Sequence, residues 1–253
     1  MTLITDPLFY AFAVPAIIFL GLSKGGFSGI GMVSTPLVAI IMPPLEAAAL
    51  LLPSLLVQDA FSAFIYRRVW DPWNLKVLLP GCVVGVGCAW LFAAHVSDSA
   101  VRLMVGLIAL GFVAYAVFRH YLPGESPRPR ASHGVFWGAL SGFTTTLIQI
   151  GAPPYYAFVL PQLLEKMIYV GTTVMFFAAA NAMKVVPYSA LGQFSTAGLL
   201  TSFALFPLAI ASNYLGIWLV RVTPETIFYR ITNVLVLLIG LELTRQGVTG
   251  LMG

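Results

Sequence analysis

Charged residues are scarce in this chain of 253 residues. Asp, Glu, Lys and Arg make up 9% of the chain, whereas 59% of the residues are hydrophobic. Soluble domains carry about 25% charged residues. The mean hydropathy of +0.93 therefore indicates an integral membrane protein and leaves no room for a soluble domain of useful size. The net charge of +4 comes from arginines in loops, so we interpret it as a topology signal and not as a nucleic-acid footprint.

Cysteine and histidine are also scarce. The two cysteines, Cys82 and Cys88, lie in one apolar segment and point in different directions on a helix, which excludes a disulfide between them. His95, His120 and His133 have no metal-ligand spacing. The chain contains no paired nucleophile and base, no phosphate loop and no zinc motif. We therefore expect neither an enzyme nor a cofactor.

Long apolar runs dominate what remains. Six of them approach the roughly 20 residues that cross a bilayer core, and they predict an all-α, multi-pass membrane protein. These runs are 46–66, 75–94, 99–118, 168–190, 197–219 and 226–244.

Two further apolar segments are interrupted by small polar residues. The first break is 21–31, inside apolar sequence from Leu8 to Met42, and the second is 138–154, inside apolar sequence from Val135 to Pro161. Such a break exposes backbone polar groups at membrane depth, which is tolerable only inside protein or beside a cavity. Two breaks at matching positions are the usual sequence pointer to the binding site of a transporter.

The two halves of the chain match each other. Each half has one broken segment followed by three apolar runs. Glu46 and Glu165 open corresponding runs, and Ser62 and Asn181 each lie sixteen residues further on. The halves predict a first transmembrane repeat at 1–120, a cytoplasmic linker at 121–133 and a second repeat at 134–253.

The orientation of the repeats depends on how each broken segment runs. Basic residues at Arg67, Arg68 and Lys76, and in the linker, predict that these loops are cytoplasmic. If each broken segment crosses the membrane once, the repeats are parallel. If each folds back as a hairpin of two half-helices, the repeats are inverted. The hairpin agrees better with the distribution of basic residues and with transporter design in general, so we favour it.

Five polar side chains in the apolar segments are candidates for chemistry. Lys24 lies in the first break, and Gln58 and Asp59 lie in the middle of the run 46–66. Asn181 and Lys184, three residues apart in the matching run, share a helix face. An ionisable residue inside a membrane is expensive and is a functional hypothesis by default. We predict that the two lysines bind an anion and that Asp59 carries a proton or acts as a counter-ion.

The breaks themselves supply hydroxyl, amide and backbone N–H donors. A half-helix that begins at a break aims its positive end at a bound anion. The alternative for each of these residues is simple helix packing or, for the lysines, snorkelling to the interface. The predicted donors are Ser23, Ser28, Gly29, Gly31, Thr144, Thr145, Thr146, Gln149 and Gly151.

The chain resembles the TauE/SafE family of anion exporters, also described as sulfite exporters. The resemblance rests on Gly25-Gly-Phe-Ser-Gly-Ile-Gly31 with Pro36-Leu-Val, on Pro44-Leu-Glu-Ala-Ala, on Tyr66-Arg-Arg-Val-Trp-Asp71, and on a weaker second copy from Gly142. It covers nearly the whole chain as an overall pattern. It implies an inner-membrane carrier that exports sulfite or organosulfonates. The second copy departs from the pattern at Gly151-Ala-Pro-Pro154 and at Thr144-Thr-Thr146, which suggests a specialised pocket there.

These observations predict a secondary transporter in the inner (plasma) membrane that exports a small sulfur-containing oxyanion, such as sulfite or sulfoacetate. Its expected partners are the anion, the lipid bilayer and, as a candidate, a second copy of the chain. Alternating access of the two repeats would move the anion, and Asp59 would couple export to protons. Three alternatives stay open: an ion channel, a cation transporter with Asp59 and Glu46 as ligands, and a purely structural membrane partner.

Overall fold

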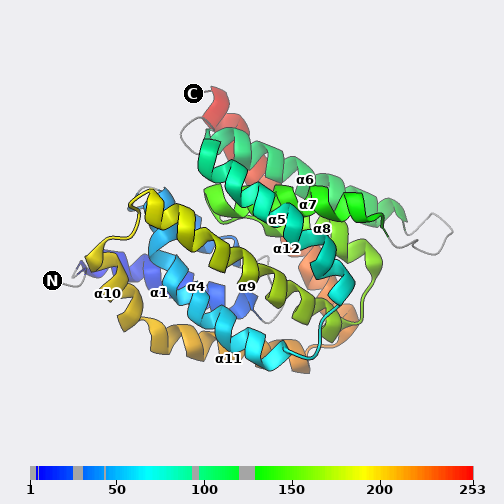
Figure 1. Ribbon diagram of the computed structural model, residues 1–253, viewed down its shortest axis with the longest axis horizontal. Coiled ribbons are helices and arrows are strands. Elements are labelled where there is room, and N and C mark those ends of the chain that lie inside the picture. The colour runs from blue at the N-terminus through cyan, green and yellow to red at the C-terminus, as the bar shows by residue number, and fades with distance from the viewer. Residues whose placement is uncertain are drawn as a thin grey trace.

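The computed structural model is all-helical over the part of the chain that it describes, residues 4, 6–24, 31–42, 44–92, 97–119 and 129–252 (Figure 1). No strand occurs among these residues, which confirms the predicted all-α class. The first-half helices are α1 (Pro7–Ser23), α3 (Ser34–Val38), α4 (Pro44–Tyr66), α5 (Pro72–Phe92) and α6 (Asp98–Arg119). The second half has α7 (Ala131–Ile148), α8 (Ala152–Val159), the 3-10 turn η1 (Leu160–Gln162), α9 (Lys166–Ala190), α10 (Thr196–Ala204), α11 (Phe206–Val222) and α12 (Glu225–Met252).

Among the described residues, four helices are long and apolar enough to cross a membrane: Glu46–Tyr66, Pro72–Phe92, Lys166–Ala190 and Thr226–Met252. A fifth span results if α10 and α11, which meet at a bend of 51°, are counted as one. These helices match five of the six predicted runs. The remaining run, 99–118, lies in α6, where the described Ser99–Gly111 is a shorter apolar helix.

The second break lies within the predicted segment 138–154 but is shorter, because α7 continues through Gly138 to Ile148. The first break is described only at its edges, since residues 25–30 lie outside the described part of the chain. In the first, α1 ends at Ser23 and the next described helix after Gly31 is the short α3. In the second, α7 ends at Ile148, and Gln149 adopts a left-handed conformation with φ 58°. Gly151 is then the N-cap of α8, which has proline in its first turn. Proline at that position starts a helix readily and cannot continue a preceding one, so α7 and α8 stay separate.

The second broken segment turns back on itself. Gly134 in the first turn of α7 faces Phe158 near the end of α8, so that a Cβ atom at Gly134 would lie 3.0 Å from the Phe158 ring. Gln162, just after α8, donates to the Asn74 side chain at 2.8 Å, in the first turn of α5. Gly134 also faces Val77 of α5. Both ends of this segment therefore lie beside the start of α5.

The two ends of the first broken segment also lie close together, beside α4. Ile4, before α1, and Met42, after α3, line one cavity together with Glu46 in the first turn of α4. Lys24, in the middle of the segment, contacts Asp59 much further along α4. Both ends of the first segment therefore lie beside the start of α4, whereas Lys24 reaches into the protein.

Glycines hold each broken segment against a helix of the other half. Gly81 and Gly85 of α5 are four residues apart and meet the backbone of α7, where a Cβ at Gly85 would lie 1.9 Å from the carbonyl oxygen of Ala139. On the other side, a Cβ at Gly216 of α11 would lie 2.5 Å from the carbonyl oxygen of Gly21 in α1. Small residues allow this close approach of membrane helices. Each half thus packs its broken segment on the other half: α7 of the second half packs on α5 of the first, and α1 of the first half packs on α11 of the second.

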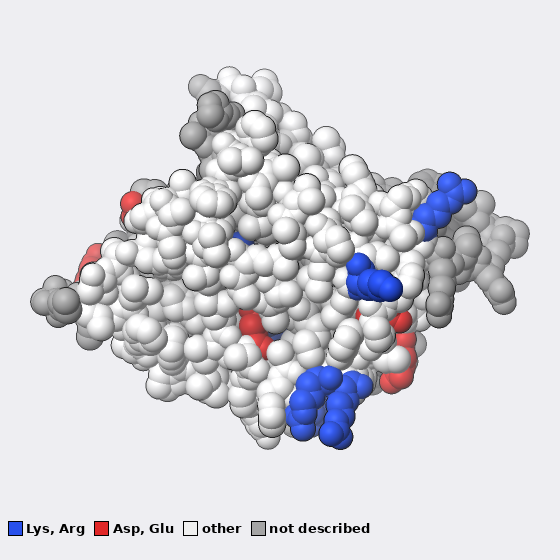
Figure 2. Space-filling view, viewed as in Figure 1, with Lys and Arg blue, Asp and Glu red and all other residues white. Residues whose placement is uncertain are grey.

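Basic side chains gather at one end of the bundle. Lys166 at the start of α9 donates to the carbonyl oxygens of Val220 at 2.9 Å and Thr223 at 2.8 Å, at the end of α11. Asp71, before α5, donates its N–H to Thr172 of α9 at 2.8 Å. The exposed Lys and Arg side chains of the face in Figure 2 lie on its right-hand side.

Candidate substrate-binding site

The two breaks meet around one cavity inside the bundle. The cavity contains about 620 Å³ of empty space, part of which is open to the exterior. Helices α1, α7, α8 and α9 all contribute to its wall, as does the start of the segment that follows the first break. Its polar lining is Ser23, Lys24, Gly31, Thr35, Thr145, Gln149, Gly151, Thr173 and Asn181, and its apolar lining is Leu20, Met32, Leu55, Ala152, Val174 and Phe177.

Lys24 is placed at this cavity because α1 ends one residue before it. Its Nζ atom donates to Oδ1 of Asp59 at 2.5 Å, and both side chains are buried, with 8% and 4% of their surface exposed. An ammonium group in a membrane-buried position needs a partner or water. Here the partner is a carboxylate from the middle of α4, and the charges of this pair cancel.

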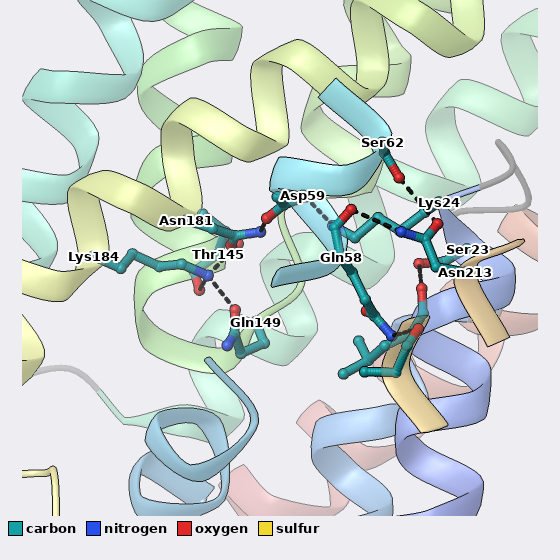
Figure 3. A network of polar contacts seen from close by, with 12 residues as sticks. Ser23, Lys24, Gln58, Asp59, Ser62, Thr145, Gln149, Asn181, Lys184 and Asn213 are labelled. Carbon is teal, nitrogen blue, oxygen red and sulfur yellow. Dashed lines mark hydrogen bonds and ion pairs between the residues drawn. The ribbon is translucent and has the colours of Figure 1, made fainter. Parts of the chain in front are cut away.

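Asp59 has a second donor on its other oxygen. The side-chain amide of Asn181 donates to Oδ2 of Asp59 at 2.6 Å (Figure 3). This carboxylate therefore joins the first break, α4 and α9. Asp59 itself does not line the cavity, but both of its partners do. Any change in the charge of Asp59 would act directly on two cavity-lining donors.

Lys184 makes the equivalent connection to the second break. Its Nζ atom donates to Oγ1 and the backbone oxygen of Thr145 at 3.3 and 3.4 Å, and to Oε1 of Gln149 (Figure 3). Gln149 in turn donates to the carbonyl oxygen of Ala48 at 3.3 Å. The Lys184 side chain is completely buried, and it lies behind the wall that Thr145 and Gln149 form.

Some predicted ligands lie elsewhere. Gln58 is completely buried, and its amide donates to the carbonyl oxygens of Ala209 at 3.1 Å and Ile17 at 3.4 Å. Thr144 and Thr146 donate back to the preceding turn of α7. None of these three lines the cavity, and these contacts serve helix packing. Ser28 and Gly29 lie outside the described residues.

Thr35 and Thr173 line the cavity although sequence reasoning did not select them. A signal for Thr173 was present, because Thr173, Phe177 and Asn181 are spaced four residues apart and therefore share one face of α9. Over the described part of the chain, no group of three or more His, Cys, Asp or Glu residues could hold a metal ion.

Several apolar helices of membrane length, with two interrupted segments that meet around a polar cavity, define a membrane transporter. Within that class, the chain belongs to the sulfite exporter TauE/SafE family, whose model matches residues 13–243. Membership confirms the resemblance seen in the sequence and implies a membrane exporter of sulfite or another anion. Comparisons with curated proteins and with solved structures gave no match.

Proposed function

We propose that this protein is a secondary transporter of the inner membrane that exports a small sulfur-containing oxyanion, sulfite or an organosulfonate such as sulfoacetate. The observation that carries the proposal is the cavity between the two breaks. Its wall combines one lysine with amide and hydroxyl groups from both halves of the chain. A sulfite or sulfonate group presents three oxygen acceptors, which N–H and O–H donors complement.

Lys24 and Asn181 are the donors that connect binding to protons. In the absence of an anion, both donate to Asp59. An anion in the cavity competes with the Asp59 carboxylate for them. A proton on Asp59 weakens its hold on both donors and releases them to the anion. Binding of the anion and protonation of Asp59 therefore favour each other, as symport of a proton together with the anion requires.

Inverted repeats would supply the alternating access. The ends of the first broken segment lie beside the start of α4, and the ends of the second lie beside the start of α5. Since α4 ends where α5 begins, the two segments enter the bundle from opposite ends. This supports two inverted hairpins that rock around one site.

Labelling of single cysteines tests the inversion. In a Cys82→Ser, Cys88→Ser background, Asp6→Cys and Arg130→Cys should react with a membrane-impermeant thiol reagent from opposite sides of the membrane. If each broken segment instead crossed once, both positions would be cytoplasmic. Labelling of both from the same side would reject the inverted arrangement.

The cation-transporter alternative needs a free carboxylate in the cavity. Both oxygens of Asp59 already accept from nitrogen donors, and Glu46 lines a different cavity beside Gln193 and Ser195. The anion proposal agrees better with these contacts. It predicts that Lys24→Ala abolishes binding, whereas the cation alternative predicts that Asp59→Asn abolishes it and Lys24→Ala spares it.

The test is ligand-induced thermal stabilisation of the purified protein. The panel contains sulfite, sulfate, thiosulfate and organosulfonates, with chloride and alkali cations as controls, at two pH values. A ligand at 100 times its Kd stabilises the folded form by about 2.7 kcal/mol, roughly 5–10 °C in Tm for a chain of this size. We expect such a shift with a sulfur oxyanion and its loss in Lys24→Ala. Stabilisation by cations alone, or by nothing on the panel, would overturn the proposal.

A further inference from the structure

The Lys184 side-chain amine is buried and has neutral partners only. Its side chain is completely buried, and its hydrogen-bond acceptors are the hydroxyl and carbonyl oxygens of Thr145 and the amide oxygen of Gln149. Within the described ranges it has no carboxylate partner, whereas Lys24 is paired with Asp59. The two lysines of the site are therefore electrostatically different (Figure 3).

The charges of the site do not balance. Among the residues that the structure describes, three charged side chains line the cavity or bond to a residue that lines it: Lys24, Asp59 and Lys184. The first two cancel, and Lys184 in its protonated form leaves one positive charge in excess. Residues 25–30, within the first break, carry no charged side chain. Arg102 bonds to Gln246 and lines a separate, smaller pocket.

An unbalanced buried charge is costly, because the protein interior solvates an ammonium group much less well than water does. The hydroxyl and amide dipoles around Lys184 offset only part of this cost. A negative charge in the cavity, on the other side of Thr145 and Gln149, would offset the rest. An anion in the cavity and the protonated form of Lys184 therefore stabilise each other.

We propose that Lys184 sets the charge of the substrate: while Asp59 is ionised, the single excess positive charge of protonated Lys184 selects a monovalent oxyanion, such as a monosulfonate or hydrogensulfite, over a divalent one. The inference rests on the proposed function and adds the charge class of the substrate to it. Lys184 acts from behind the wall, through its electric field and by fixing the Gln149 side chain. A dianion, such as sulfoacetate with its sulfonate and carboxylate groups, is accepted only when Asp59 is neutral, because the site then carries two positive charges.

Three probes of similar shape and different charge test this rule. They are dimethyl sulfone (neutral), methanesulfonate (one negative charge) and sulfate (two negative charges). Their Kd values are measured by thermal stabilisation of the purified full-length protein at low ionic strength, where screening is weak. The unmodified protein should bind methanesulfonate most tightly.

Each variant of the site should then bind most tightly the probe whose charge balances the charge left in the site. Lys184→Gln should raise the Kd of methanesulfonate by on the order of 100-fold, the effect of a unit charge about 6 Å away at an effective dielectric constant of about 20. It should leave the Kd of dimethyl sulfone unchanged. Lys184→Arg keeps the charge and should keep the preference for methanesulfonate. Asp59→Asn should transfer the preference to sulfate. Lys76→Gln, which removes an exposed lysine, is the matched control and should change none of the three.

The outcomes separate the inference from the proposed function. If no oxyanion binds the unmodified protein, the proposed function fails, and the charge rule fails with it. If methanesulfonate binds equally well to the Lys184→Gln variant, only the charge rule is overturned. Loss of all three probes in that variant would show a structural role for Lys184 and would also overturn the rule. If Lys184→Arg does not fold, Lys184→Gln and Asp59→Asn still test the charge rule. An unchanged preference for methanesulfonate in Asp59→Asn would contradict it.

Discussion

The ion pair between Lys24 and Asp59 gives a prediction in which a second mutation restores stability. We consider Lys24→Met, Asp59→Leu and the double variant. Lys24→Met leaves the Asp59 carboxylate with Asn181 as its remaining donor. Asp59→Leu leaves the Lys24 ammonium without a counter-ion and the Asn181 amide without its acceptor. In the double variant both charges are gone, and only the Asn181 amide is unpaired.

The magnitudes follow from burial, since 8% and 4% of the two side chains are exposed. Removing one partner of a buried ion pair costs about 3–5 kcal/mol, and leaving a buried amide donor unpaired costs about 1–3 kcal/mol. We therefore expect a loss of about 3–5 kcal/mol for Lys24→Met, about 4–8 kcal/mol for Asp59→Leu and about 1–3 kcal/mol for the double variant.

The assay is thermal unfolding of the four purified proteins in one detergent, without ligand. The double variant should unfold roughly 10 °C above Asp59→Leu. The exposed pair of Arg245 and Glu242 on α12 is the control, with 65% and 48% of the side chains exposed, and Arg245→Met should change Tm little. If the double variant unfolds at or below the Tm of Asp59→Leu, Lys24 and Asp59 are not a mutually compensating buried pair.

Three further predictions concern the scaffold. Gly85→Ala should lower Tm by roughly 5–10 °C, because its Cβ would meet the α7 backbone, whereas Gly87→Ala on the same helix has open space and should not lower it. Lys166→Met should lower Tm by roughly 5 °C through loss of two carbonyl contacts at the end of α11, with exposed Lys76→Met as its control. Gln149→Gly suits the left-handed backbone, so thermal unfolding should show a folded protein, whereas ligand-induced shifts should be weaker.

The sequence was sufficient to predict the helical segments and both breaks. Long apolar runs and clusters of Gly, Ser and Pro are local signals, and α1, α7 and α8 end and begin where these residues stand. The position of Lys24 and Asp59 inside apolar segments also indicates that they lie at membrane depth. That position alone makes both residues candidates for the site. The order of one broken segment and three long helical segments in each half was also visible.

Contacts between distant segments were not readable in this way. The hydrogen bond between Asn181 and Asp59 joins residues 122 positions apart. The local sequence also does not specify which of the two lysines forms the ion pair with Asp59. Gln58 was predicted as a ligand because it adjoins Asp59. Successive residues on a helix point about 100° apart, and Gln58 therefore faces α1 and α11 instead of the cavity. The depth of a residue in the membrane identifies it as a candidate, but the rotation of its helix about the helix axis determines whether its side chain faces the cavity.

The packing of α1 against α11 also has a consequence for the order of synthesis. The helix that carries Lys24 leaves the ribosome about 180 residues before Phe206 and the rest of its main packing partner, an interval of roughly 10–40 s at ordinary rates of translation. During that time α1 lacks its main packing partner, and the close contact between Gly21 and Gly216 cannot form. The residues that line the candidate site extend only to Asn181 of α9, so all of them are made before the helix that packs on α1.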